Sequence, residues 1–311
     1  MGLVGSLSSA QTCPVVIDLN SIQYGVSSEV DAAISKPTTK QQSSFAQVGG
    51  NYYFAATTND LGVELYSSDG LAAFTSLVKD IHPSGSSNPK NLTALGTELF
   101  FSADDGVHGI ELWKTDGTAA GTVLVKDILP GAGGSSPLAF TAFGTKLLVS
   151  ADGGAGFREL WISDGTAAGT VKLSSGISNP SWMAVDAAGS KVFFSATRPD
   201  IGAELWATDG TPGGTALVKD IQSGAESSLP FHLVTWNGKT YFTALNSSFG
   251  RELWATDGTA GGTTLVKDIN PGFQGSNVSL DSHASFGGHL YFRAEDGVHG
   301  VEPWRTDGTA A

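Results

Sequence analysis

The chain has 311 residues, of which 40% are hydrophobic and 41 are glycine, and its 17 basic and 30 acidic residues give a formal net charge of −13. This apolar content supports a sizeable core and excludes a disordered chain. The acidic balance argues against nucleic acid as a partner, and no apolar window is long enough to span a membrane as a helix. The single cysteine, Cys13, excludes an intramolecular disulfide.

The N-terminal end of the chain carries one strand-like segment. Residues 1–14 are predicted to be a tail, either the remnant of a signal peptide or an unrelated end, because they lack a basic start and a long apolar run. Residues 15–20 read VVIDLN and match the pattern of LVKDIN at 265–270. We therefore expect 15–20 to be a β-strand.

One motif then recurs six times. Its copies read ELYSSDG, ELWKTDGT, ELWISDGT, ELWATDGT twice and EPWRTDGT, and they begin at Glu64, Glu111, Glu159, Glu204, Glu252 and Glu302. The intervals between these glutamates are 47, 48, 45, 48 and 50 residues. In the second unit, strand-like segments at 91–97, 98–103, 110–115 and 122–128 are separated by glycine-rich turns. Four short antiparallel strands in each repeat are typical of a β-propeller blade.

The ends of the chain favour a closed ring. The last unit stops at 311, before a fourth strand, and segment 15–20 has the pattern of that strand. Pairing the two would leave no open sheet edge. The sequence therefore predicts an all-β fold: a single six-bladed β-propeller over 15–311, made of four-stranded antiparallel blades and closed by an N-terminal strand that completes the last blade.

The repeated motif resembles the ELWxxDGT repeat family of bacterial, mostly extracellular, proteins. The resemblance covers residues 15–309 and rests on the six motif copies, which depart from the pattern at Tyr66, Ser68 and Pro303. The third unit also has a shortened outer strand, VKLSS at 171–175. The resemblance implies a secreted or cell-surface protein and implies no reaction, because the family is recognised by its repeat.

The repeated residues themselves are expected to be structural. Strand alternation predicts that Trp113 and its equivalents pack between neighbouring blades. Glu111 and Lys126 are 15 residues apart, a spacing that recurs in three other units, and we expect a cross-strand ion pair there. The shortened third unit breaks this pattern at Glu159. Asp116 of the TDGT turn is expected to accept backbone N–H groups two or three residues further on.

Function is expected where the units differ. The loops that lead into each inner strand end in residues that vary from unit to unit: Lys90-Asn91, Leu138-Ala139, Ser181-Trp182, Phe231-His232 and Asp281 to His283. A mixed aromatic and polar set around one central mouth suits a sugar or a small polar ligand, with ordinary loop variation as the alternative. The predicted ligand-binding residues are Lys90, Asn91, Trp182, Phe231, His232, Asp281 and His283.

A metal site receives little support from the sequence. His108 and His299 occupy equivalent DGVHG loops, but these belong to units that are not neighbours, so hydrogen-bonded loop histidines are expected. Asp127 and Asp268 offer oxygen ligands for calcium without the spacing of a known calcium loop. We predict no cofactor and no metal ligands, with calcium as the alternative.

No motif of nucleophilic or metal-dependent catalysis is present, since the chain has no G-x-S-x-G, H-E-x-x-H or P-loop segment. We therefore predict that the protein is not an enzyme. The prediction is a secreted or cell-surface binding module directed at carbohydrates or surfaces, with a glycan or cell-surface partner. Two alternatives stay open: a polysaccharide-acting hydrolase or lyase that uses His232, His283, Asp281 or Lys90 at the central mouth, and a structural subunit of an extracellular assembly.

Overall fold

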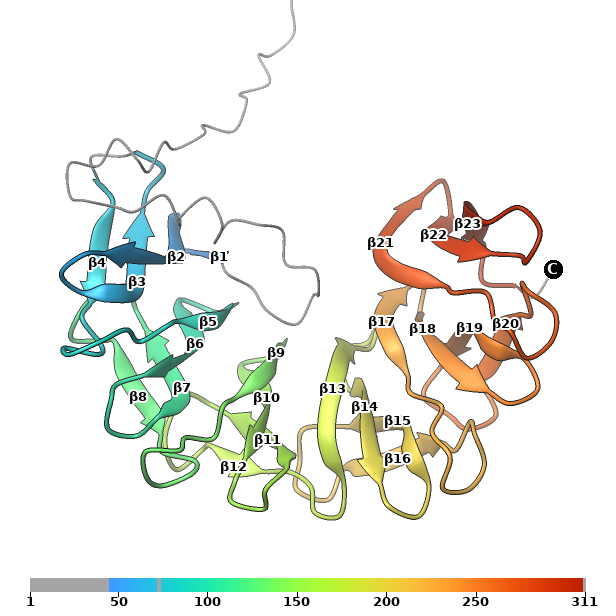
Figure 1. Cartoon of the computed structure of the whole chain (residues 1–311), viewed down its shortest axis with the longest axis horizontal. Helices are drawn as coiled ribbons and strands as arrows, with labels where there is room; N and C mark the ends of the chain where they lie inside the picture. Colours follow the sequence, from blue (N-terminus) through green and yellow to red (C-terminus); the bar gives the residue numbers. More distant parts are fainter. Residues whose placement is uncertain (1–44, 72–73, 310–311) are drawn as a thin grey trace, which may run out of the picture.

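A computed structural model describes residues 45–71 and 74–309, and its regular elements are β-strands (Figure 1). The first two sheets contain β1 (Phe45–Val48), β2 (Asn51–Thr58), β3 (Gly62–Ser68) and β4 (Ser76–Lys79), then β5 (Lys90–Leu95), β6 (Glu98–Asp104), β7 (Ile110–Thr115) and β8 (Val123–Lys126). The third and fourth sheets contain β9 (Leu138–Phe143), β10 (Lys146–Asp152), β11 (Arg158–Ser163) and β12 (Val171–Lys172), then β13 (Ser178–Val185), β14 (Val192–Arg198), β15 (Gly202–Thr208) and β16 (Thr215–Lys219). The last two contain β17 (Phe231–Trp236), β18 (Lys239–Asn246), β19 (Gly250–Thr256) and β20 (Thr264–Lys267), then β21 (Ser279–Phe286), β22 (His289–Glu295) and β23 (Val301–Thr306).

Each sheet is a run of consecutive antiparallel strands, so every repeat builds one sheet. The predicted four-stranded unit is confirmed in five sheets, and three strands are described in the sixth. The first strand of each sheet lies on the inside of an arc, beside the first strand of the next sheet (Figure 1). The fold is therefore all-β and propeller-like.

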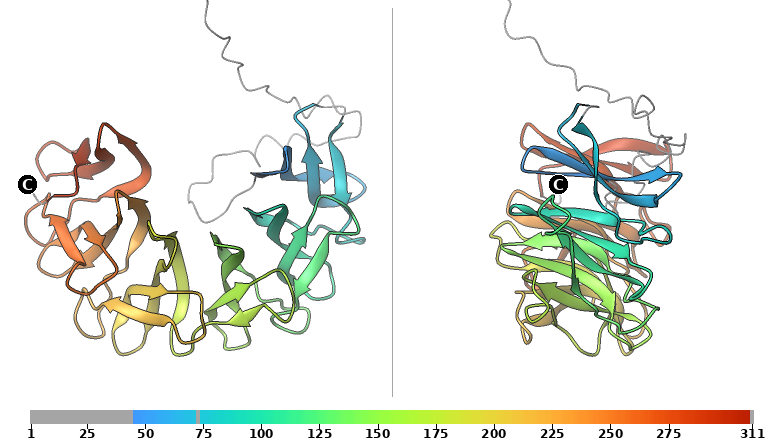
Figure 2. Two further views of the ribbon diagram at one scale, coloured as in Figure 1. Left: turned by 180° about the vertical axis from the view of Figure 1, so that it is seen from behind. Right: turned by 90° about the vertical axis from the view of Figure 1, so that its left-hand side faces the viewer.

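The arc is open. The first and sixth sheets stand apart on its two sides, and no strand pairing joins them within the described ranges (Figure 2). The predicted closed ring is thus not what these residues form. The predicted tail at 1–14 and the predicted closing strand at 15–20 lie outside the described residues.

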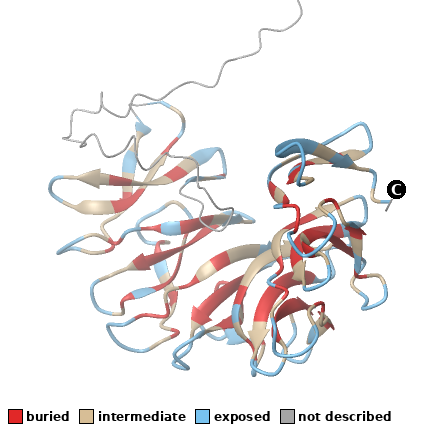
Figure 3. Cartoon of the chain, turned by 45° about the vertical axis from the view of Figure 1, so that its right-hand side comes forward, coloured by how far each residue is buried: buried red, intermediate tan, exposed pale blue. Residues whose placement is uncertain are grey.

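Five apolar clusters hold the six sheets together, and each lies between two neighbours. Phe101 and Trp113 of the second sheet, for example, pack with Tyr53 and Leu65 of the first. The equivalent tryptophans Trp206 and Trp254 are also about nine-tenths buried or more, which confirms the predicted packing role. The sixth sheet has a neighbour on one side, and its other face is largely exposed (Figure 3).

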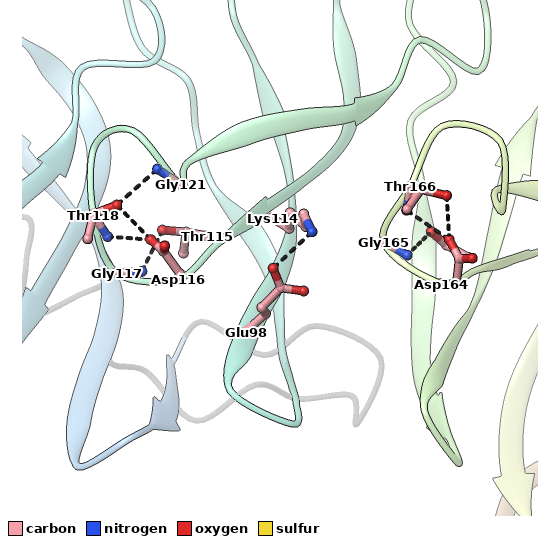
Figure 4. A network of polar contacts seen from close by, with 11 residues as sticks. Glu98, Lys114, Thr115, Asp116, Gly117, Thr118, Gly121, Asp164, Gly165 and Thr166 are labelled. Atoms are coloured by element: carbon pink, nitrogen blue, oxygen red, sulfur yellow. Dashed lines mark hydrogen bonds and ion pairs between the residues drawn. The ribbon is translucent and has the colours of Figure 1, made fainter.

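The TDGT turns form as the sequence predicts. The Asp116 carboxylate accepts the backbone N–H of Thr118 at 2.8 Å and its hydroxyl at 2.7 Å, and Asp164 binds Thr166 in the same way (Figure 4). These hydrogen bonds stabilise the ionised carboxylate and lower the pKa of Asp116. The positive φ of 94° at Gly117 explains the glycine.

In four of the sheets the repeated glutamate does not pair with lysine, contrary to the expectation. The fully buried Glu111 carboxylate accepts the backbone N–H groups of Ile128, Leu129 and Ser135 at 2.7 to 3.1 Å, and the Ser135 hydroxyl at 2.6 Å. It therefore holds the loop that leads to the next sheet. We name this arrangement the loop anchor, and it recurs at Glu64, Glu204 and Glu252.

The repeated lysines bind the next sheet instead. The ammonium group of Lys126 donates to the carbonyl oxygen of Thr170 at 2.9 Å and lies 6.0 Å from the centre of the Trp161 ring. Lys79 and Lys219 bind the equivalent threonine carbonyls of their neighbouring sheets. We call each of these contacts a lysine bridge. A bulge in the outer strand, where two residues face one, turns the lysine toward the neighbour.

The third sheet has neither a loop anchor nor a lysine bridge among its described residues. Its outer strand β12 has two residues and no bulge, and Lys172 pairs with Glu159 of the same sheet at 2.9 Å. The loop is also shorter, because Pro180 lies 21 positions after Glu159, whereas Pro137 lies 26 positions after Glu111. A loop of this length does not wrap around the carboxylate, so a glutamate–lysine ion pair forms in a unit that was expected to break the pattern.

Candidate functional site

Four inner strands share one irregularity. In β5, β9, β13 and β17, two residues face one residue of the neighbouring strand, and the first of the two has a left-handed backbone. These residues are Asn91 (φ 59°), Ala139 (55°), Trp182 (54°) and His232 (57°). Such a backbone is uncommon outside glycine, and strained residues of this kind concentrate at functional sites.

The sixth sheet carries a larger version of the same bulge. Between the pairs Ser279–Arg293 and Ala284–Tyr291, four residues of β21 face one residue of β22. Asp281 lies within this bulge. Several of the variable positions predicted from the sequence are therefore bulge positions, whereas Lys90 and Phe231 are the paired residues just before a bulge.

The bulges of the third to sixth sheets surround one cavity, which we name the axial pocket. Its lining residues are Ala139, Phe140, Thr141, Trp182, Met183, His232, Leu233, Val234, Leu280 and Asp281. Its free volume is about 60 Å³, which is space for about two water molecules. A ligand larger than this would lie across the mouth of the pocket and contact its rim.

Aromatic and charged groups meet at this rim. The Trp182 ring lies 4.8 Å from the His232 ring, edge to face, and 5.6 Å from the Phe231 ring. His232 Nε2 lies 3.1 Å from Asp281 Oδ1. The Arg251 guanidinium lies 4.8 Å from the centre of the Phe231 ring, and burial lowers the pKa of Arg251. An arginine stays charged under these conditions, so the rim presents both charges beside an apolar surface.

Three of the predicted ligand-binding residues lie elsewhere. Asn91 is buried in the second sheet, where its side-chain amide donates to Ser102 and to the carbonyl oxygen of Pro137, and Lys90 is the exposed residue before it. His283 directs Nδ1 at the carbonyl oxygen of Leu280, 2.7 Å away. These three residues do not line the axial pocket, whereas Trp182, His232 and Asp281 do, with Phe231 beside them.

Sequence reasoning missed several of the site's residues. Arg251 follows the glycine of a repeat loop and gave no functional signal. Met183, Leu233 and Leu280 are the apolar neighbours of predicted residues. A search for the residue that follows each predicted position would have found Met183 and Leu233, because each is the second residue of a bulge whose first residue was predicted.

The axial pocket places the His232 ring within hydrogen-bond distance of the Asp281 carboxylate, beside an apolar lining. The one hydroxyl group among its lining residues belongs to Thr141, and it donates to the carbonyl oxygen of Ala139 at 3.3 Å. It is therefore not directed at the imidazole as a nucleophile would be. Within residues 45–71 and 74–309, no three acidic, histidine or cysteine side chains converge as a metal site. The calcium alternative thus gains no ligand cluster.

The DGVHG histidines form hydrogen bonds inside their own loops. His108 Nδ1 lies 2.7 Å from Asp105 Oδ2, and His299 repeats this contact with Asp296 at the same distance. The hydrogen bond to the carboxylate raises the pKa of each histidine. Among the described helices and strands, no helix is long and apolar enough to cross a membrane.

Comparison with known proteins shows the fold. No family model matches the chain, and no curated protein matches it. A puromycin-hydrolysing peptidase of Mycobacterium tuberculosis is similar in structure, with a TM-score of 0.52 and 13% identity over 86% of this chain and 45% of that one. A structure from a study of two prolyl endopeptidases has a TM-score of 0.50 and 12% identity over 87% of this chain and 41% of its own. The chain therefore spans less than half the length of these peptidases and corresponds to their β-propeller domains.

These neighbours contradict the predicted function. The sequence favoured a non-enzymatic module that binds carbohydrates, whereas the two solved structures described above are peptidases. A glycan partner has no support from them. At 12 to 13% identity the likeness shows the fold alone. The resemblance to the ELWxxDGT family and the predicted location at the cell surface or outside the cell stay predictions.

Proposed function

We propose that this chain is the propeller-type part of a hydrolase that acts on peptides, and that the axial pocket contacts the peptide. The observation that carries the proposal is the meeting of Trp182, Phe231, His232 and Asp281, from three different sheets, at one rim. The repeated residues of the fold are absent from this rim. A surface that departs from the repeat at neighbouring positions is typical of a binding site on a repeat scaffold.

The chemistry of the rim fits a peptide. The Trp182 and Phe231 rings offer flat apolar surfaces of the kind that hold proline and aromatic side chains. The Asp281 carboxylate can accept a hydrogen bond from a peptide N–H group. The His232 ring can donate a hydrogen bond to a peptide carbonyl group or accept one from an N–H group. The small volume of the axial pocket suits one side chain or ring while the rest of the peptide lies across the mouth. Bond cleavage would come from groups outside the axial pocket.

The test uses the chain with ¹⁵N-labelled tryptophan and short synthetic peptides that contain proline. We expect a saturable shift of the Trp182 indole signal, and loss of binding in Trp182→Ala and in His232→Ala. Val107→Ala, which trims an exposed loop side chain of the second sheet, is the matched control. Cleavage of the same peptides is followed by mass spectrometry. The proposal fails if the peptides neither bind nor are cleaved, or if binding is unchanged in both pocket variants.

We also propose that residues 15–20 form the fourth strand of the sixth sheet and so bring the fold toward a six-bladed propeller. Glu302 has the register of Glu252, since the two face Ala294 and Ala244 on the preceding strands. Glu252 is fully buried in its loop anchor, whereas Glu302 is exposed. A space of about 440 Å³ adjoins Glu302, where the other sheets carry an outer strand and its loop.

The sequence of the segment fits that space. In the fifth sheet the anchor carboxylate accepts the N–H groups of the two residues that follow aspartate in LVKDIN, at 265–270. The same two positions in VVIDLN are Leu19 and Asn20, which would donate to Glu302. Burial of about four aliphatic side chains at roughly 1.5–3 kcal/mol each would accompany this pairing.

Truncation tests the pairing. Deletion of residues 1–20 is expected to remove most of the thermal stability or to cause aggregation through the exposed edge, whereas deletion of 1–12 is nearly silent. Glu302→Ala should destabilise the chain only when 15–20 is present. Equal effects of Glu302→Ala in the full and truncated chains, or an unchanged melting temperature after deletion of 1–20, would contradict the pairing.

A further inference from the structure

The joint between the third and fourth sheets contains a groove. Because β12 has no bulge and Lys172 turns back to Glu159, no lysine bridge crosses this joint within the described residues. A groove of about 340 Å³ opens there, and we name it the outer groove. It lies on the outer side of the arc, away from the axial pocket, and its volume is within the range of small-molecule sites.

The outer groove is lined by one cationic side chain, that of Arg198. The Arg198 guanidinium carbon lies 5.5 Å from the centre of the Trp206 ring, where the first two joints place a lysine ammonium beside the equivalent ring. The Trp206 ring is fixed by a hydrogen bond from its N–H to the carbonyl oxygen of Ala196. Arg198 is about one-third exposed, so a ligand in the groove can reach it.

The guanidinium group of Arg198 is held by a hydrogen bond at its Nε edge. Arg198 Nε donates to Asp200 Oδ1 at 2.6 Å, and this hydrogen bond uses neither of the two terminal amino groups. Terminal guanidinium amino groups bind a carboxylate in a planar, bidentate manner, and the carboxylate of Asp200 holds the plane in one orientation. Asp200 itself is strongly exposed, so water screens its charge from a second anion in the groove.

The opposite wall offers hydroxyl groups and apolar surface. Ser174 and Ser175 come from the short loop after β12, and the buried Ser174 Oγ has no hydrogen-bond partner among the described residues. Leu173 and Ile177 are buried beneath them. A buried hydroxyl without a partner is unfavourable, and rotation of the Ser174 side chain toward the groove would let a ligand oxygen accept its hydrogen bond.

We propose that the outer groove binds an organic carboxylate that carries an apolar substituent, such as the C-terminal residue of a peptide. The carboxylate pairs with the terminal amino groups of Arg198 and accepts the Ser174 hydroxyl, and the apolar substituent lies against Leu173 and Ile177. This site is independent of the proposed axial pocket, because no lining residue is shared between them.

N-acetyl-leucine and its uncharged amide are the matched probes for this site. In protein with ¹⁵N-labelled tryptophan, N-acetyl-leucine is expected to shift the Trp206 indole signal in a saturable manner, while the amide binds about tenfold more weakly or not at all. The Trp206 signal is assigned with Trp206→Phe. Equal binding of acid and amide would overturn the proposal, and so would a shift confined to other tryptophans.

Three variants separate the groove from a general effect of charge. Arg198→Gln is expected to weaken N-acetyl-leucine binding about tenfold or more. Arg305→Gln removes the same charge from an exposed site on the sixth sheet and should leave binding unchanged. Ser175→Tyr fills the groove and should abolish binding even if Arg198→Gln proves unstable. Retained binding in a folded Ser175→Tyr protein would overturn the proposal, whatever the outcome for the axial pocket.

Discussion

The second and third sheets are built from the same repeat and are held in different ways. In the second sheet, Glu111 is buried and accepts three backbone N–H groups, and Lys126 reaches the next sheet. In the third sheet, Glu159 is also buried, but it pairs with Lys172, whose side chain is partly exposed. A loop that is five residues shorter accounts for both changes, because it removes the donors of the loop anchor and the bulge that directs the lysine. Residues at the same position of the repeated motif can therefore have different partners, and the length of the following loop determines which partner is bound.

The largest expected effect comes from removing the anchor carboxylate. Glu111→Ala leaves three buried N–H groups without an acceptor and should lower the free energy of unfolding by about 3–5 kcal/mol. Glu159→Ala removes one partly exposed ion pair, worth about 0–1 kcal/mol. Thermal denaturation of the two variants measures the difference. Similar losses of stability would show that the two sheets are held alike.

The next test introduces a loop anchor into the third sheet. Replacing residues 171–180 with the sequence of 123–137 gives the third sheet a full outer strand and loop. We expect Glu159 to become a loop anchor and the outer groove to close, with a higher melting temperature and loss of N-acetyl-leucine binding. A second replacement of 171–180, by a glycine and serine segment as long as 123–137, controls for loop length alone. If both replacements stabilise equally, the anchor is not the cause.

Replacing the repeated lysines should change the free energy of unfolding by smaller amounts. Lys126→Met removes a charge-assisted hydrogen bond to the neighbouring sheet and a contact with Trp161, and should cost about 1–2 kcal/mol. Lys172→Met loses a contact within one sheet that is partly open to water, and should cost about 0–1 kcal/mol. Denaturant titration distinguishes the two values. A larger loss for Lys172→Met would contradict the distinction between bridged and unbridged joints.

The same contrast explains what the sequence could and could not predict. Six sheets, their antiparallel order, the packing of Trp113 and the turn at Asp116 follow from local patterns that repeat, and all are confirmed. The partner of Glu111 depends on a loop that folds back over 24 residues, which no local pattern encodes. Trp182 and His232 were found because they break the repeat. Their neighbour Arg251 was missed, because it reaches the rim through a long side chain from another strand.

A further expected effect is a dependence of stability on pH that belongs to the anchored sheets. Burial raises the pKa of Glu252 from its ordinary value to about 7, and it also raises the pKa values of Glu111 and Glu204. Between the unfolded pKa and the folded pKa, the folded chain binds more protons than the unfolded chain, so stability falls as the pH rises from about 4.5 to 7. The melting temperature should therefore be a few degrees higher at the acidic end of this window.

Two variants assign that slope. Glu252→Gln keeps the shape of the side chain without its titration and should make the profile less steep, with Glu111 and Glu204 supplying the rest of the slope. Asp116→Asn should leave the slope unchanged because the pKa of Asp116 already lies below the window. The loop histidines act in the same direction, since the raised pKa values of His108 and His299 give stability that is lost as the pH rises through them. Both rings are exposed, so their share should shrink in high salt, whereas the buried Glu252 should keep its share. A slope that persists in Glu252→Gln and disappears in salt would assign the pH dependence to the histidines and not to the anchor.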